Sequence, residues 1–109
     1  MIVNVLGTEY LIKESNKVED LALENCDGYC DYSTKTIVID TFKNYEELPD
    51  TLGNMDGYKK KVIRHELVHA FLSESGLNAN SWANNEEIVD WIAYQFPKLK
   101  EAFEKCDVL

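Results

Sequence analysis

Residues 58–75 read YKKKVIRHELVHAFLSES, a stretch that contains neither glycine nor proline. Apolar residues recur in it at the spacing of one helix face, at Val62, Ile63, Leu67, Ala70 and Phe71. A glycine follows at position 76, and glycine is the residue that most often ends a helix. The stretch therefore predicts one long helix in the second half of the chain.

The residues before this helix have the patterns of two β-hairpins. Residues 2–6 and 9–12 are rich in β-forming residues, and a tight-turn signal, Gly7-Thr8, separates them. Residues 29–32 and 36–40 flank a short polar turn, and the second of these runs contains Thr-Ile-Val-Ile. We therefore expect two antiparallel pairs of strands.

Two further segments join these elements. Residues 18–24 have apolar residues at helical spacing, and Asn16 is placed to cap a short helix there. Residues 44–57 contain Pro49, two glycines and several Asp or Asn residues, so they are expected to form mostly loop.

The C-terminal residues predict two more helices. Asn84 or Asn85 can cap a helix that runs to Phe96. Pro97 suits the first turn of a last helix that ends near Cys106.

The order of strands first and helices afterwards predicts an α+β fold. We expect a small, mainly antiparallel sheet of about four strands with the helices packed on one side. At 109 residues the chain fits a single domain, residues 1–109.

The charge and composition of the chain argue against several classes of partner. A formal net charge of −9 disfavours binding to nucleic acid or to an anionic membrane. No stretch approaches the roughly 20 apolar residues that span a bilayer, and the N-terminus does not resemble a signal peptide. Three cysteines, Cys26, Cys30 and Cys106, are expected to be free thiols. These features predict a cytoplasmic location.

The chain has only two histidines, and both lie in the predicted helix as H-E-x-x-H. His65 and His69 are four residues apart, so their imidazoles share one face of the helix, with Glu66 beside them. A hydrolytic zinc site needs three protein ligands and one open position for water. The carboxylates of Glu86 and Asp90 return on the next predicted helix, again four residues apart.

This pattern, H-E-x-x-H followed by Glu-x-x-x-Asp, resembles that of the gluzincins, a clan of zinc metallopeptidases. The resemblance implies that Glu86 binds Zn²⁺ with the two histidines, and that Asp90 accepts a hydrogen bond from the free ring nitrogen of His65. Glu87 is the rival third ligand. Residues 59–96 also resemble minimal ImmA/IrrE-like prophage-associated metallopeptidase domains, although the chain lacks the helix-turn-helix segment of many members.

In such a site Glu66 projects about 100° around the helix from its neighbours, so it reaches the metal-bound water rather than the metal. It would act as general base and pass the proton to the leaving amine. The donor that stabilises the developing oxyanion is open among four candidates, namely Arg64, Tyr94, Tyr58 and Tyr29. An extended substrate is expected to add a strand along residues 29–32 or 36–40.

We therefore predict a zinc metallopeptidase that hydrolyses peptide bonds of a protein or peptide. An alternative is a catalytically inactive zincin-fold module that keeps the metal and acts in binding or regulation. A third hypothesis is a structural zinc site with Cys30 or Cys26 as fourth ligand. The patterns leave the substrate's identity and the oligomeric state open.

Overall fold

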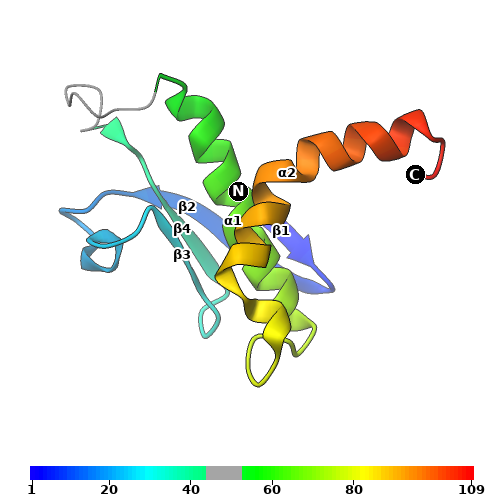
Figure 1. Ribbon diagram of the computed structural model, residues 1–109. Helices are drawn as coiled ribbons and strands as arrows, with labels where there is room; N and C mark the ends of the chain where they lie inside the picture. Colours follow the sequence, from blue (N-terminus) through cyan, green and yellow to red (C-terminus); the bar gives the residue numbers. More distant parts are fainter. Residues whose placement is uncertain (44–52) are drawn as a thin grey trace.

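A computed structural model describes residues 1–43 and 53–109, and within these ranges the fold is α+β (Figure 1). The sheet strands come first in the chain, and two long helices follow. The elements are β1 (Ile2–Val5), β2 (Thr8–Ser15), the 3-10 helix η1 (Leu21–Leu23), β3 (Gly28–Asp31), β4 (Thr36–Asp40), α1 (Met55–Glu74), the 3-10 helix η3 (Trp82–Asn84) and α2 (Glu86–Lys105).

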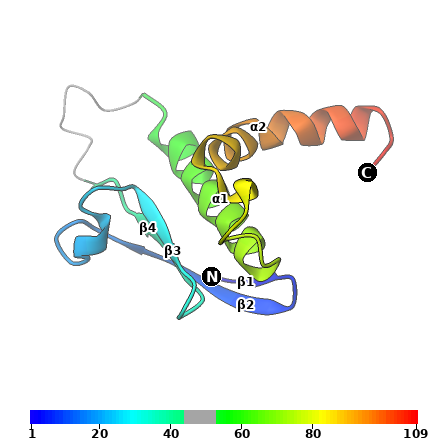
Figure 2. The same cartoon turned by 60° about the horizontal axis from the view of Figure 1, so that its bottom comes forward.

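Both predicted hairpins are confirmed, but the sheet that they build is mixed. β1 pairs with β2 and β3 pairs with β4, each antiparallel. The strand order is β1-β2-β4-β3, so β4 lies between β2 and β3 and runs parallel to β2, with Ile12 opposite Ile37. The expectation of a mainly antiparallel sheet is therefore replaced by two hairpins joined through a parallel pair. β3 is left as one edge of the sheet (Figure 2).

The first hairpin turns one residue earlier than predicted. Leu6 and Gly7 both have positive φ, 51° and 93°, which is the conformation of a two-residue type I′ turn. The side chain of Asn4 accepts a hydrogen bond from the Gly7 N–H and holds this turn. Glycine suits its position because the left-handed region is costly for residues with a Cβ.

The predicted helix over residues 18–24 is wrong, since only the three residues of η1 are helical there. Val18 and Leu21 are 80% and 75% exposed, and Leu23 is the one buried residue of η1, so the segment lacks the continuous apolar face that a longer helix needs. Asn16 instead accepts N–H groups of a turn, and Asp20 caps η1.

Helix α1 lies across one face of the sheet (Figures 1 and 2). It confirms the helix predicted over residues 58–75, and Gly76 at φ 75° ends it. It begins at Met55, because Asn54 caps it, so the end of the predicted loop is helical. Residues 44–52 of that loop lie outside the described residues. Buried side chains of the sheet and of α1 form the core, namely Val5, Tyr10, Ile37, Ile39, Phe42, Val62 and Ala70.

The predicted helix boundary at Pro97 is wrong, because α2 continues through this residue to Lys105. Asn85 caps the helix, as one of the two predicted candidates. Proline has no N–H for the carbonyl four residues earlier, that of Ala93, and the Arg64 side chain donates to it instead, at 2.6 Å. The ribbon changes direction in this part of α2, and the remainder projects from the molecule (Figure 1).

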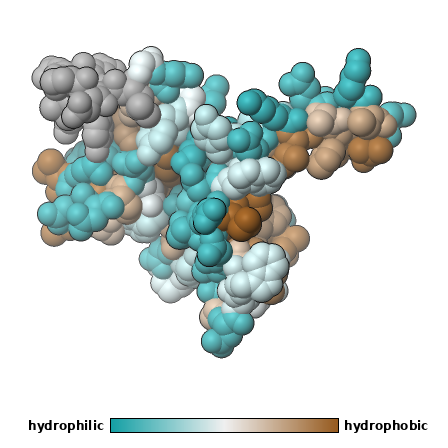
Figure 3. Space-filling view, viewed as in Figure 1, coloured by the Kyte–Doolittle hydropathy of each residue, from teal (hydrophilic) through white to brown (hydrophobic). Residues whose placement is uncertain are grey.

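The projecting part of α2 exposes apolar side chains, among them Phe96 and Phe103. Apolar atoms cover part of it in the space-filling view (Figure 3). Among the helices in the described ranges, none has the length and apolar character needed to cross a membrane.

Candidate metal centre

Three side chains from two helices bring potential metal ligands together. His65 and His69 stand one turn apart on α1, and Glu86 is the first residue of α2. The Nε2 atoms of the two histidines are 3.2 Å apart. The Glu86 carboxylate lies 3.0 Å from Nε2 of His65 and 2.8 Å from Nε2 of His69. One ligand atom of each residue therefore lies within 4.8 Å of the others.

The other ring nitrogen of each histidine faces a side-chain oxygen. Nδ1 of His65 is 3.0 Å from Oδ1 of Asp90, the contact that the gluzincin resemblance predicts. Nδ1 of His69 is 2.8 Å from Oδ1 of Asn84. The Asn84 amide nitrogen in turn donates to the carbonyl of Asn78, which assigns the oxygen to the side facing His69. These oxygens are placed to accept from Nδ1 of each ring, the arrangement in which Nε2 is left to bind a metal.

The contact of Asn84 with His69 was not predicted, because Asn84 was expected only as a candidate helix cap. It ends η3, directly before the residue that caps α2. The sequence did offer one signal for this contact, since Asn84 has a side-chain oxygen and lies two residues before the predicted ligand Glu86.

These residues fit a divalent cation. Two imidazole nitrogens and one carboxylate are a donor set typical of catalytic zinc. Around tetrahedral zinc with bonds of about 2.0–2.1 Å, neighbouring ligand atoms are about 3.3 Å apart, close to the 2.8 to 3.2 Å found here. Two lone pairs and a carboxylate repel one another at such distances, so a cation between them would stabilise the arrangement.

Among the described residues, the other predicted ligands, Glu87, Cys26 and Cys30, are not part of the group of converging ligand atoms. Glu87 is exposed, and its backbone N–H bonds to the cap residue Asn85. Cys26 and Cys30 line the neighbouring cavity as free thiols, but neither sulfur is among the converging atoms. A structural site with a cysteine as fourth ligand therefore has no support in the geometry.

Glu66 lies beside the group without being part of it. Its side chain is buried, and its carboxylate is 4.0 Å from Nε2 of His65. Burial raises the pKa of Glu66 to about 7; the charge of Glu86 also raises it, whereas His69 lowers it. A carboxylate with this pKa exchanges a proton readily near neutral pH, as a general base must.

Lys61 extends the hydrogen-bonded chain behind His65. Its Nζ lies 2.5 Å from the same Asp90 oxygen that faces His65. Partial burial works to raise the pKa of Asp90, but hydrogen bonds from Lys61 and His65 outweigh it and lower that pKa. Asp90 is therefore held as a carboxylate between two donors.

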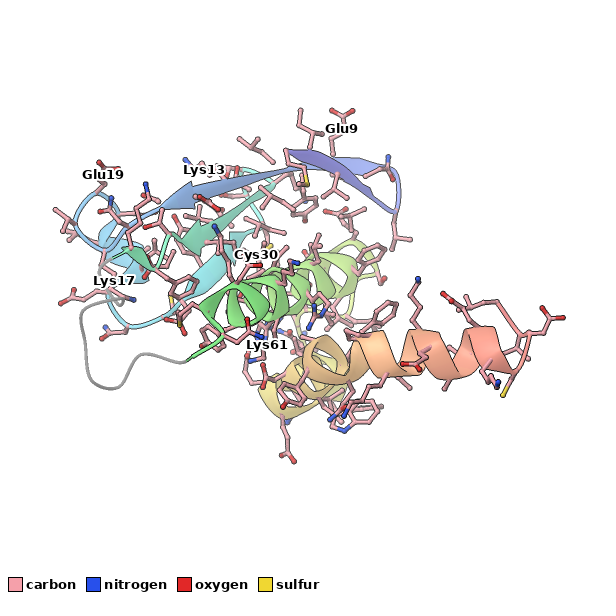
Figure 4. The ribbon with its side chains drawn as sticks, turned by 90° about the horizontal axis from the view of Figure 1, so that it is seen from above. Glu9, Lys13, Lys17, Glu19, Cys30 and Lys61 are labelled. Atoms are coloured by element: carbon pink, nitrogen blue, oxygen red, sulfur yellow. The ribbon has the colours of Figure 1, made fainter. Side chains whose placement is uncertain are left out.

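Figure 4 shows two of the residues around the site. Lys61 lies where α1 faces α2, and Cys30 lies between the sheet and α1.

A cavity of about 480 Å³ opens in front of the three ligands. Its walls come from α1, from the start of α2, and from residues 26–32, which include the edge strand β3. Of the two predicted substrate edges, only β3 is an edge of the sheet, because β4 pairs on both sides.

The four predicted oxyanion donors lie in different surroundings. Arg64 donates to the Ala93 carbonyl, and Tyr94 is 63% exposed and does not line the cavity. Tyr29 and Tyr58 do line it, but their hydroxyls donate to the carboxylates of two aspartates, Asp20 and Asp27 respectively. A fifth candidate, Tyr32, also lines the cavity and was not singled out from the sequence.

In comparisons with known proteins, the chain matches no family model, no curated protein and no solved structure. The assignment of a function therefore depends on the site itself.

Proposed function

We propose that the chain is a zinc-dependent peptidase of the gluzincin type, with His65, His69 and Glu86 as metal ligands and Glu66 as general base. The observation that carries the proposal is the convergence of three potential ligand atoms beside the buried carboxylate of Glu66. The open cavity in front of them supports an exchangeable position rather than a closed structural site.

The chemistry assigned to each residue follows from its position. A bound zinc ion would acidify a water molecule and polarise the substrate carbonyl. Glu66 takes a proton from the attacking water as the water oxygen bonds to the carbonyl carbon. When the carbon–nitrogen bond breaks, Glu66 returns the proton to the leaving amine, so that a carboxylic acid and an amine are formed.

The substrate of this reaction would be an extended peptide. An edge strand has unpaired backbone N–H and C=O groups on its outer side, and a peptide can pair with them as an added strand. β3 is such an edge, and it also forms one wall of the cavity that holds the ligands. A peptide paired with β3 would therefore run past the metal position.

Replacement of Glu66 by Gln tests the proposal. The zinc-loaded protein and the E66Q variant are incubated with a mixed library of internally quenched fluorogenic peptides. We expect E66Q to bind zinc normally and to lose cleavage by about 10²–10⁴-fold, because a general base contributes that much. E87Q makes the same change of charge at an exposed neighbour of the site, and it should cleave like the unchanged chain.

Two results would contradict the proposal. Equal cleavage by E66Q and the unchanged chain would remove Glu66 as the base. Stoichiometric zinc without any cleavage across the library would favour the alternative, a binding module that keeps the metal.

A further inference from the structure

Among the described residues, three tyrosines line the cavity, and they differ in whether the hydroxyl proton is already donated within the protein. Tyr29 donates to Asp20, and Tyr58 donates to Asp27. For the hydroxyl of Tyr32, no hydrogen-bond partner is found among residues 1–43 and 53–109. This O–H group is therefore free to bond to a molecule that enters the cavity.

Tyr32 directly follows β3, in the turn that leads to β4, and its side chain lines the cavity. Within the strand side chains alternate, so Gly28 and Cys30 share one face. A Cβ placed on Gly28 would come within 3.0 Å of the Val62 side chain, which shows that this face of β3 lies against α1. Cys30, the next residue of the face, packs against the core. Tyr32 lies two residues beyond Cys30 and lines the same cavity as Glu66 of α1.

The surroundings of Tyr32 keep it protonated. Burial raises the pKa of Tyr32 to about 12, and the nearby carboxylates of Glu66 and Glu86 add to this rise. Tyr32, Glu66 and Glu86 all line the same cavity. At neutral pH Tyr32 is therefore a hydrogen-bond donor.

We propose that Tyr32 is a catalytic residue that donates its O–H to the carbonyl oxygen of the scissile peptide bond. The inference rests on the proposed peptidase function and assigns the donor that the sequence left open. As the water oxygen bonds to the carbonyl carbon, the π electron pair moves onto the carbonyl oxygen, and the Tyr32 hydrogen bond strengthens with that charge. When the pair returns and the carbon–nitrogen bond breaks, Tyr32 keeps its proton, and Glu66 supplies the proton to the amine.

Two measurements on the Y32F variant test this role. In the first, zinc-loaded Y32F should lose about 10²–10³-fold in kcat with little change in KM, because the bond forms mainly in the transition state. Y94F removes a tyrosine hydroxyl outside the cavity and should cleave at the unchanged rate. Equal kcat values for Y32F and the unchanged chain would overturn the proposal.

The second measurement does not depend on turnover. The cobalt-substituted protein is titrated with a phosphinic dipeptide, which carries a tetrahedral oxyanion, and with 2-mercaptoethanol, which carries none; visible absorption of cobalt reports both. Y32F should bind the phosphinic dipeptide at least about 10-fold more weakly and the thiol equally well. Equal affinity for both probes would overturn the role of Tyr32.

The two measurements separate the two proposals. If the unchanged chain cleaves no peptide yet Y32F still loses phosphinate affinity, the peptidase proposal fails and Tyr32 remains the oxyanion donor of the site. If cobalt does not bind to the unchanged chain, both proposals fail.

Discussion

The side chain of Arg64 donates a hydrogen bond of 2.6 Å from Nε to the carbonyl oxygen of Ala93. This carbonyl has no helical partner because Pro97, four residues later, has no N–H. The bond therefore joins α1 to α2 at the point where α2 would otherwise be weakest. Arg64 precedes the proposed ligand His65, so the same contact holds the helix that carries Glu86 close to the helix that carries the histidines.

The Arg64 contact predicts a dependence on Pro97. R64M should lower the free energy of unfolding by about 1–2 kcal/mol, because it leaves the Ala93 carbonyl without a partner. In a P97A background the new N–H can bond to that carbonyl, so R64M should cost less than half as much. Urea denaturation of the four proteins measures this, with K60M as an exposed-lysine control. The same cost in both backgrounds would show that Arg64 acts independently of the proline.

Glu86 and Glu87 should differ sharply in their effect on metal binding. E86A should weaken zinc binding by more than about 100-fold, since loss of a direct ligand exceeds the 10–100-fold typical of an outer partner. E87A removes an exposed carboxylate and should leave the affinity unchanged. Competition with a chromophoric zinc chelator gives both dissociation constants. A larger loss in E87A than in E86A would exchange the two assignments.

Asn84 should support the metal through His69. N84L removes the oxygen that faces Nδ1 and should weaken zinc binding by about 10–100-fold. N84D keeps an oxygen at that place and should retain most of the affinity. The same chelator competition distinguishes them, and similar losses in both variants would point to the amide group rather than to the hydrogen-bond acceptor.

Glu74 links the end of α1 to both hairpins and should make stability depend on pH. The hydrogen bond from Lys35 lowers the pKa of Glu74, and those from Tyr10 and Thr8 lower it further, although burial opposes this. The unfolded chain therefore takes up the proton first, at about pH 4.3, and stability falls as the pH drops through the lower folded value.

Thermal unfolding of the metal-free protein between pH 7 and pH 3 tests this. E74Q should unfold at a lower temperature than the unchanged chain at pH 7, and the difference should shrink as the pH falls. E9Q, a change at an exposed residue of the same strand pair, should follow the unchanged chain. A constant difference between E74Q and the unchanged chain at every pH would refute the linkage.

The parts of the fold that local sequence patterns determine were predictable. Residues 58–75 form a helix because their apolar spacing and the Gly76 stop are local signals. The approach of His65 to His69 is equally local, since residues four apart share a helix face. The contact of His65 with Asp90 came from the resemblance to gluzincins, and the structure has it at 3.0 Å.

The parts that depend on distant contacts were not predictable. β4 lies between β2 and β3, and the alternation of apolar and polar residues within a strand does not specify which strands become its neighbours. Continuation of α2 through Pro97 depends on Arg64, which lies on another helix. Asn84 and Tyr32 reach the site only because η3 and the turn after β3 are folded against it.

The central claim is that His65, His69 and Glu86 hold one zinc ion with an open position. X-ray absorption spectroscopy on protein loaded with one equivalent of zinc tests it most directly, because it reports the ligand atoms without a substrate. The account predicts one zinc per chain, with nitrogen and oxygen neighbours at about 2.0–2.1 Å and the scattering of two imidazoles. A sulfur neighbour at about 2.3 Å, or zinc bound well below one equivalent, would contradict it.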